Sequence, residues 1–262
     1  MNALSTIDWD RGGLRLVVLF VTGVLVVWTL WEAVILWRQF SDRSEVGQDW
    51  EFYVSIGQRW LETGVLYGER QLSGAPYHVL VNVDNLYPPP AILLFVPFAL
   101  LPSPLSEVAW WGVPVAAIIA IVVRFRPSAW TWPLIAACAF WPRTLGSIIV
   151  GNSDLWSAAF VVGGILWGWP GALGIFKPSL APFALAGARR RSWWFAVGGL
   201  AAVSILFLIT GAWADYLIVV THWDLPWDRQ LLNAPLLLIP VLVWLGRRPP
   251  SVSSAGAAEG VT

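Results

Sequence analysis

The sequence is poor in charged residues, and it contains a single cysteine and a single lysine. Only 12% of the 262 residues are charged and 57% are hydrophobic, whereas soluble domains carry about 25% charged residues. A chain of this composition cannot cover its surface with polar side chains, so we expect it to lie in a lipid bilayer. The lone Cys138 excludes a disulfide and a cysteine-rich metal site within the chain.

Motifs for soluble cofactors and for nucleic acid are also missing. The sequence has no Gly-rich dinucleotide motif and no phosphate-binding loop ending in Gly-Lys-Ser/Thr. Its formal net charge is zero, so no basic field indicates nucleic acid as a partner. Two distant histidines and one cysteine do not make a zinc site. We therefore expect no cofactor and no bound metal.

Long apolar runs dominate the rest of the sequence. A helix needs about 20 apolar residues to cross the hydrocarbon core. The runs predict an all-α, polytopic transmembrane helical bundle of about eight spans in one membrane-embedded domain, 1–248, followed by a disordered tail, 249–262. The candidate spans are 14–37, 88–102, 107–123, 130–142, 147–168, 171–187, 193–212 and 233–246.

Arginine clusters predict the orientation of these spans. Lys and Arg near span ends favour the cytoplasmic side. Three clusters can all be placed on the cytoplasmic side by the eight-span list: Arg11 and Arg15, Arg189 to Arg191, and Arg247 and Arg248. They predict a multi-pass protein of the plasma membrane, with both termini cytoplasmic and the loops 38–86 and 213–232 outside. The same eight-span map leaves Arg124 and Arg126 facing outward, against the rule.

The loop 38–86 between the first two spans has a pattern of its own. Within 48–64, apolar residues recur at helical spacing at Phe52, Ile56, Trp60 and Leu61. This spacing predicts an amphipathic helix lying on the outer membrane surface.

The order of several residues resembles glycosyltransferase family 87. The matching positions are Asp49 and Tyr53, then Gly57, Leu61, Gly64 and Tyr67, then Tyr87, Pro88 and Pro89, then Pro97, Leu101 and Pro102. Downstream, 151-GNSDLW-156 and 174-GIFKPSLAPFALAGARRRSWW-194 are similar to two further stretches of the family. Family members are commonly longer, so the resemblance implies a short or truncated member.

The resemblance implies the type C glycosyltransferase fold and a membrane hexosyltransferase. The enzyme would move a hexose, with mannose expected, from a polyprenyl-phosphate donor to a glycolipid or glycan acceptor on the extracytoplasmic face. It implies a catalytic base at Asp49, because the acceptor hydroxyl must lose a proton as it attacks the anomeric carbon. The alternative is that Asp49 only stabilises the start of a helix.

Four further residues are candidates for substrate binding within or next to apolar runs. Lys177, the only lysine, lies inside one such run, where an ionisable residue indicates function. Its ammonium could contact the donor's phosphate, or it could form an ion pair with Asp154. Asn152 and Asp154 could line a polar cavity or join helices. Tyr87 opens the 88–102 run.

Two polar residues between the runs complete the candidates. His222 could orient an acceptor hydroxyl or be an ordinary surface residue, and Arg229 could bind sugar hydroxyls. Arg143 we expect at the membrane interface, with its guanidinium towards the headgroups.

Two other functions fit the same residues. Buried Lys177 and Asp154 could serve a polar path in a small membrane transporter, although the two halves of the sequence show no repeat. The short length also fits a non-catalytic relative that binds polyprenyl lipid.

Overall fold

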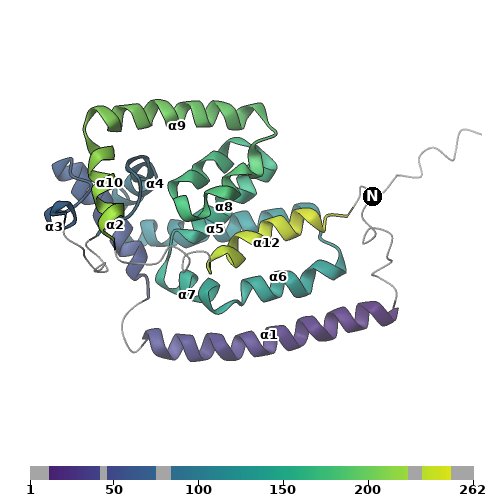
Figure 1. Cartoon of the computed structure of the whole chain (residues 1–262). Helices are drawn as coiled ribbons and strands as arrows, with labels where there is room; N and C mark the ends of the chain where they lie inside the picture. The colour runs from purple at the N-terminus through teal and green to yellow at the C-terminus, as the bar shows by residue number, and fades with distance from the viewer. Residues whose placement is uncertain (1–11, 42–45, 75–83, 224–231, 249–262) are drawn as a thin grey trace, which may run out of the picture.

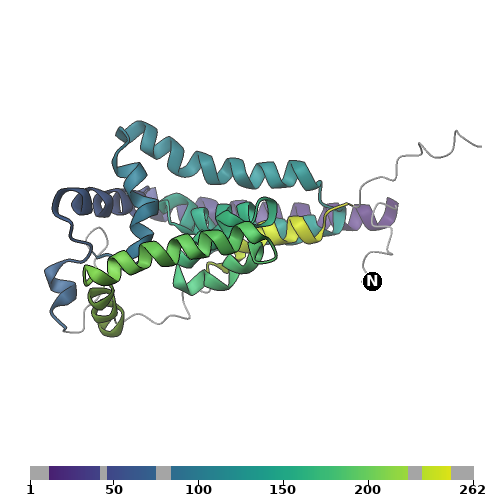
Figure 2. The same cartoon turned by 90° about the horizontal axis from the view of Figure 1, so that it is seen from above.

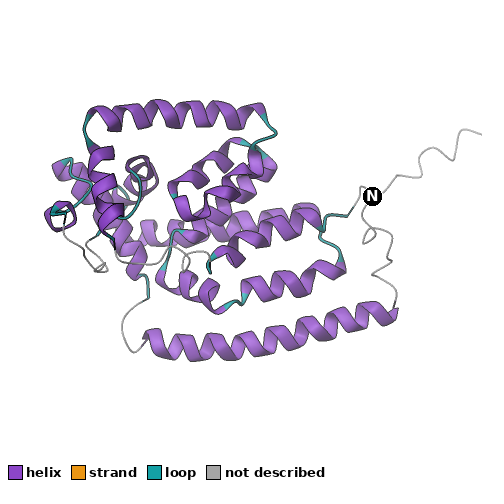
Figure 3. Ribbon diagram, viewed as in Figure 1, coloured by secondary structure: helices purple, strands orange, loops and turns teal. Residues whose placement is uncertain are grey.

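The computed structural model describes residues 12–41, 46–74, 84–223 and 232–248. All regular elements in these ranges are helices (Figure 3). The α-helices are α1 (Gly12–Ser41), α2 (Gln48–Thr63), α3 (Glu69–Leu72), α4 (Ile92–Ala99), α5 (Ser103–Phe125), α6 (Trp132–Ala139), α7 (Pro142–Val150), α8 (Asp154–Leu166), α9 (Arg191–Ile209), α10 (Ala212–His222) and α12 (Ala234–Leu245). The 3-10 helices are η2 (Pro89–Ala91), η3 (Ala129–Thr131), η4 (Trp169–Phe176) and η5 (Pro178–Gly187).

The longest helices, α1, α5 and α9, run along the length of the molecule, and four other helices gather at one end of it (Figure 1, Figure 2). Figure 1 shows α2, α3, α4 and α10 together at the left, which we call the α2 end. Seen from above in Figure 2, α5 (teal) and α9 (green) run along the molecule away from that end. The α2 end is therefore distinguished from the opposite end by the helices that gather there.

Arginines collect at the opposite end, which we call the arginine end. The backbone N–H of Ser128 donates to the carbonyl of Gly246 at 2.8 Å, which joins the start of η3 to the end of α12. Arg15 and Arg248 line a cavity of about 370 Å³ together with Ala129 and Trp132. The first turn of α1, the segment after α5 and the end of α12 therefore meet.

The segment predicted as the span 88–102 stays at the α2 end. It forms η2 and the eight-residue α4, which buries Ile92, Phe95 and Phe98. Trp50 of α2 donates to Ser106 Oγ at 3.3 Å, so α5 begins beside α2. Prolines before and inside α4 shorten it, because proline cannot donate an internal helix hydrogen bond.

The direction of α5 corrects the predicted position of two arginines. Since α5 begins at the α2 end, its last turn lies at the arginine end. Arg124 and Arg126 close that turn, immediately before the Ser128–Gly246 contact. They therefore lie on the same side as Arg248, and the map that placed them opposite the other clusters was wrong on this point.

Two predicted spans are interrupted, which is a second correction. The run 147–168 is divided between α7 and α8 by Gly151, whose φ is 74°. The run 171–187 contains two 3-10 helices that meet at Lys177, where the backbone is extended. Hydropathy does not reveal these breaks, because the residues before and after each break are mostly apolar.

Two described helices, α5 and α9, are long and apolar enough to cross a membrane. The count becomes three if η3–α6 and α7, which are bent by 59°, form one broken span. Both α5 and α9 expose apolar side chains such as Ile119 and Leu206, as expected for lipid contact. The larger number of about eight spans stays a prediction.

The helix α2 occupies the segment where a helix was predicted, but it buries a different face. Its buried residues are Trp50, Tyr53, Ile56 and Gly57. Of the apolar face predicted from the sequence, only Ile56 is buried, while Leu61 is 45% exposed. The reason is that α2 packs against α4 and α5 rather than standing alone. Whether α2 lies on a membrane surface stays a prediction.

Close glycine packing holds η4 and η5 against α8. A Cβ atom on Gly164 of α8 would come within 3.1 Å of Gly171 Cα and 3.2 Å of Gly187 N. Small residues allow backbones to approach this closely. The packing carries Lys177, at the η4–η5 junction, back to the first turn of α8.

Candidate active site

The turn between α7 and α8 is the centre of a polar cluster at the α2 end of the bundle. Gly151 takes the left-handed conformation there, and a Cβ atom on it would come within 2.6 Å of the Trp111 ring. Two indole N–H groups fix the turn: Trp110 donates to Gly151 O and Trp111 to Ile148 O, each at 2.7 Å. Only glycine satisfies both the backbone angle and the space.

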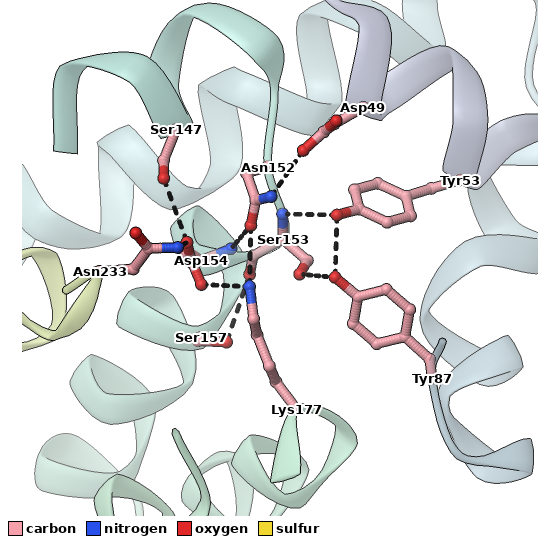
Figure 4. Close-up of polar contacts among 10 residues, drawn as sticks. All are labelled: Asp49, Tyr53, Tyr87, Ser147, Asn152, Ser153, Asp154, Ser157, Lys177 and Asn233. Atoms are coloured by element: carbon pink, nitrogen blue, oxygen red, sulfur yellow. Dashed lines mark hydrogen bonds and ion pairs between the residues drawn. The ribbon is translucent and has the colours of Figure 1, made fainter. Parts of the chain in front are cut away.

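Asp154, the first residue of α8, is fully buried and has both carboxylate oxygens engaged. Its Oδ1 lies 2.5 Å from Lys177 Nζ. Its Oδ2 accepts hydrogen bonds from Ser147 Oγ at 3.1 Å and from Asn233 Nδ2 at 2.8 Å (Figure 4). A buried carboxylate requires such partners, since an unpaired charge would be costly. Elements from three parts of the chain therefore converge on Asp154.

Asn152 connects this ion pair to Asp49. Lys177 Nζ donates to Asn152 Oδ1 at 2.9 Å, and Asn152 Nδ2 donates to Asp49 Oδ2 at 2.5 Å. An ammonium only donates and a carboxylate only accepts, so the two partners determine which way the amide faces. The N–H of Asp154 also donates to Asn152 Oδ1, at 3.1 Å. Lys177 thus sets the orientation of the amide that holds Asp49.

Asp49 lies in the first turn of α2 and is partly buried. Burial raises the pKa of its carboxyl above the ordinary value of 3.8. The Asn152 hydrogen bond and the charge of Lys177 lower this pKa, and the charge of Asp154 raises it. Among the described residues, the hydrogen bond of the Asp49 side chain goes to Oδ2. Its Oδ1 is left available to accept a proton.

A chain of hydroxyl groups fastens α2 to the same turn. Tyr53 Oη lies 2.9 Å from Tyr87 Oη, which lies 2.7 Å from Ser153 Oγ (Figure 4). Tyr67 donates to the carbonyl of Tyr87 at 2.8 Å. Tyr53 also stacks on Phe95, with ring centroids 4.8 Å apart. These contacts hold Asp49, one turn before Tyr53, opposite Asn152.

A cavity of about 380 Å³ opens beside this cluster. Its lining residues are Pro142, Arg143, Gly146, Ser147, Val150, Asn152 and Asn233. Three of them, Ser147, Asn152 and Asn233, bond directly to Asp49 or Asp154. The cavity and the buried charges therefore share one wall.

The structure brings together five of the seven residues predicted for the site, namely Asp49, Tyr87, Asn152, Asp154 and Lys177. His222 does not join them: it ends α10, and its Nδ1 lies 2.8 Å from Ile218 O in its own helix. Arg229 lies outside the described residues. Among the described residues, no group of three His, Cys, Asp or Glu is placed to hold a metal ion.

Several members of the cluster were not predicted. They are Tyr53, Ser147, Ser153 and Asn233. Ser147 and Asn233 stand at or near the starts of apolar runs, where a polar residue is a weak signal. Their convergence on Asp154 joins positions up to 79 residues apart, and no local pattern in the sequence indicates that.

The fold and the site define a helical protein with helices of membrane-spanning length and a polar, acidic cluster at one end. The family model of glycosyltransferase family 87 matches residues 85–234, more than half of the chain, so the protein belongs to that family of membrane glycosyltransferases. The matched range contains Tyr87, Asn152, Asp154 and Lys177 and begins after Asp49. No curated protein and no solved structure matches the chain.

Proposed function

We propose that the protein transfers a hexose, mannose in our proposal, from a polyprenyl-phosphate donor to a glycolipid or glycan acceptor, with Asp49 as the base. One observation carries the proposal: the Asp49 carboxylate is held by Asn152, a residue within the family match, and keeps one oxygen available. The cavity of about 380 Å³ beside Asn152 supplies space for a sugar and its phosphate.

The proposed reaction is a single displacement at the anomeric carbon. The acceptor hydroxyl gives its proton to Asp49 Oδ1 while its oxygen forms a bond to the anomeric carbon. The bond from that carbon to the phosphate oxygen breaks, and polyprenyl phosphate leaves with the electron pair. General-base assistance of this kind contributes about 10²–10⁴-fold.

Lys177 acts through its neighbours in this proposal. Lys177 is 8% exposed, and its ammonium already contacts Asp154 and Asn152. Lys177 is not among the residues that line the cavity, so its ammonium would have to leave Asp154, whose side chain has no exposure to water, to reach a phosphate there. Leaving that carboxylate unpaired would cost about 3–5 kcal/mol. We therefore favour the ion pair over the phosphate contact and assign Lys177 a positioning role.

The orientation that we propose follows from the two ends of the bundle. Arg15, Arg124, Arg126 and Arg248 lie at the arginine end, and arginine-rich ends favour the cytoplasm. Asp49 lies at the α2 end, away from these arginines (Figure 1). The active site would then face the extracytoplasmic side of the plasma membrane, where a lipid-linked donor presents its sugar.

The experiment is a transfer assay on the purified full chain in lipid nanodiscs. Radiolabelled mannosyl and glucosyl polyprenyl phosphates would be incubated with lipid and glycan acceptors, and products followed by chromatography and mass spectrometry. We expect labelled product with at least one pair. Absence of product from every pair, with folded protein, would refute the enzyme proposal and favour a non-catalytic lipid-binding relative. Uptake of sugar into proteoliposomes without transfer would instead indicate a transporter.

A further inference from the structure

Arg143 lies where a negatively charged ligand would meet the cavity beside the cluster. It is the second residue of α7, its side chain is exposed, and it lines the cavity with Asn152 and Asn233. Among the described lining residues, Arg143 alone carries a formal charge. The positive end of the α7 dipole adds to the same field.

Two of the buried charges behind the cavity wall cancel each other. Asp154 is paired with Lys177 and also accepts hydrogen bonds from Ser147 and Asn233. The ion pair is neutral as a unit, and the Ser147 and Asn233 side chains lie between it and the cavity. Asp49, bonded to Asn152 of the same wall, adds one negative charge, and Arg143 supplies the positive charge that lines the cavity itself.

We infer that Arg143 binds the phosphate of an isoprenoid phosphate ester, the donor class of the proposed function on which this inference rests. A guanidinium binds two phosphate oxygens at once, which gives both direction and strength. The amides of Asn152 and Asn233 on the same wall can contact polar groups of the sugar. This assignment replaces the expectation that Arg143 only reaches for lipid headgroups at the membrane interface.

Asn152 would then lie between the donor's phosphate, bound at Arg143, and the base Asp49. The Asn152 side chain lines the cavity and also donates to Asp49 Oδ2 at 2.5 Å. A donor whose phosphate sits at Arg143 would direct its anomeric carbon toward Asn152. The acceptor hydroxyl would then approach from the Asp49 side, as displacement from behind the leaving group requires.

Binding can be measured without transfer, by using farnesyl phosphate as the probe. The full chain in zwitterionic nanodiscs would be titrated with farnesyl phosphate, farnesol and inorganic phosphate, with binding followed by calorimetry. We expect farnesyl phosphate to bind wild type and to bind Arg143→Ala at least about tenfold more weakly, with Arg143→Lys in between. Farnesol binding should not change in Arg143→Ala.

Arg191→Ala is the matched control, because Arg191 is also an exposed arginine in the first turn of a helix. It should bind farnesyl phosphate as wild type does. Equal affinity of wild type and Arg143→Ala would overturn the inference, as would a wild type that does not bind farnesyl phosphate. If inorganic phosphate binds as tightly as farnesyl phosphate, the ligand is free phosphate and the lipid assignment is wrong.

The outcome separates this inference from the proposed function. Asp49→Asn should bind farnesyl phosphate normally, since the carboxylate is assigned to the acceptor. If Asp49→Asn retains transfer while Arg143→Ala loses binding, the base is misassigned and the phosphate site stands. If Asp49→Asn loses transfer while Arg143→Ala binds and transfers normally, only the phosphate site fails. In active preparations, Arg143→Ala should raise KM for the donor by about tenfold with little change in kcat.

Discussion

Removing Lys177 should strongly destabilise the protein. Its ammonium lies 2.5 Å from Asp154, whose side chain is fully buried. Breaking a buried pair by removing one partner costs about 3–5 kcal/mol, because the other charge stays buried and uncompensated. At about 2–4 °C per kcal/mol for a chain of roughly this size, Lys177→Met should lower Tm by roughly 6–20 °C.

The double variant tests whether the cost arises from the unpaired charge. In Lys177→Met with Asp154→Asn, both charges are absent, and the new amide can still accept from Ser147 and Asn233. We expect this variant to melt at a higher temperature than Lys177→Met alone, measured by tryptophan fluorescence in one detergent. Its transfer rate should stay low, because Asn152 has lost the ammonium that orients its amide. Additive effects of the two substitutions, or a Tm of Lys177→Met equal to wild type, would show that the unpaired Asp154 charge is not the source of the cost.

Three further predictions concern the base, the turn and the orientation. Burial raises the pKa of Asp49 above its ordinary 3.8, and protonation of the base stops transfer. The midpoint of the acid-side fall in kcat/KM should therefore lie above pH 3.8; a midpoint at or below 3.8 would contradict the assignment of Asp49 as the base. Gly151→Ala should lower Tm and reduce transfer, because the left-handed backbone alone costs about 1–2 kcal/mol and the methyl group would displace the turn; wild-type Tm and activity would show that the turn tolerates a side chain. In a Cys138→Ala background, Glu62→Cys should react with an impermeant maleimide on intact cells and Arg126→Cys only after permeabilisation; labelling of both from outside would contradict the proposed orientation.

Hydropathy and proline predicted the continuous helices well. The apolar runs 107–123, 193–212 and 233–246 correspond to α5, α9 and α12 within a few residues. An uninterrupted apolar segment forms a helix in the protein interior or in lipid, and its composition alone is enough to predict this. The runs 147–168 and 171–187 were predicted as continuous and are not. A positive φ at Gly151 and an extended residue at Lys177 break them, and both breaks depend on tertiary packing that composition does not encode.

The candidate site was predicted in its residue types more than in its connections. The ordered motif brought attention to Asp49, and an ionisable residue in an apolar run brought attention to Lys177. Their link through Asn152 joins α2 to a turn 103 residues later, so only the fold shows it. The buried face of α2 was misassigned for the same reason, since α4 and α5 decide which side of that helix is covered.

Asn152 shows why the sequence predicts residue types but not the contacts between them. Its resemblance to a family position suggested a polar cavity, and the structure adds that its amide is oriented by a cation on one side and an anion on the other. A sequence shows that a residue can donate and accept hydrogen bonds, but not which partners occupy each end. That orientation is what makes Lys177 relevant to Asp49 without any contact between them being required.

In the proposed reaction, the available oxygen of Asp49 takes the acceptor's proton. The direct test of this step is the transfer rate of Asp49→Asn beside Glu51→Gln, which alters an exposed carboxylate in the same turn of α2. Because the folded protein holds the Asp49 proton more tightly than the unfolded chain, stability decreases as pH rises from the ordinary value through the raised pKa. Asp49→Asn should therefore melt no lower than wild type at neutral pH, while its transfer rate falls by about 10²-fold or more and Glu51→Gln remains active. Transfer by Asp49→Asn at the wild-type rate would show that Asp49 is not the base.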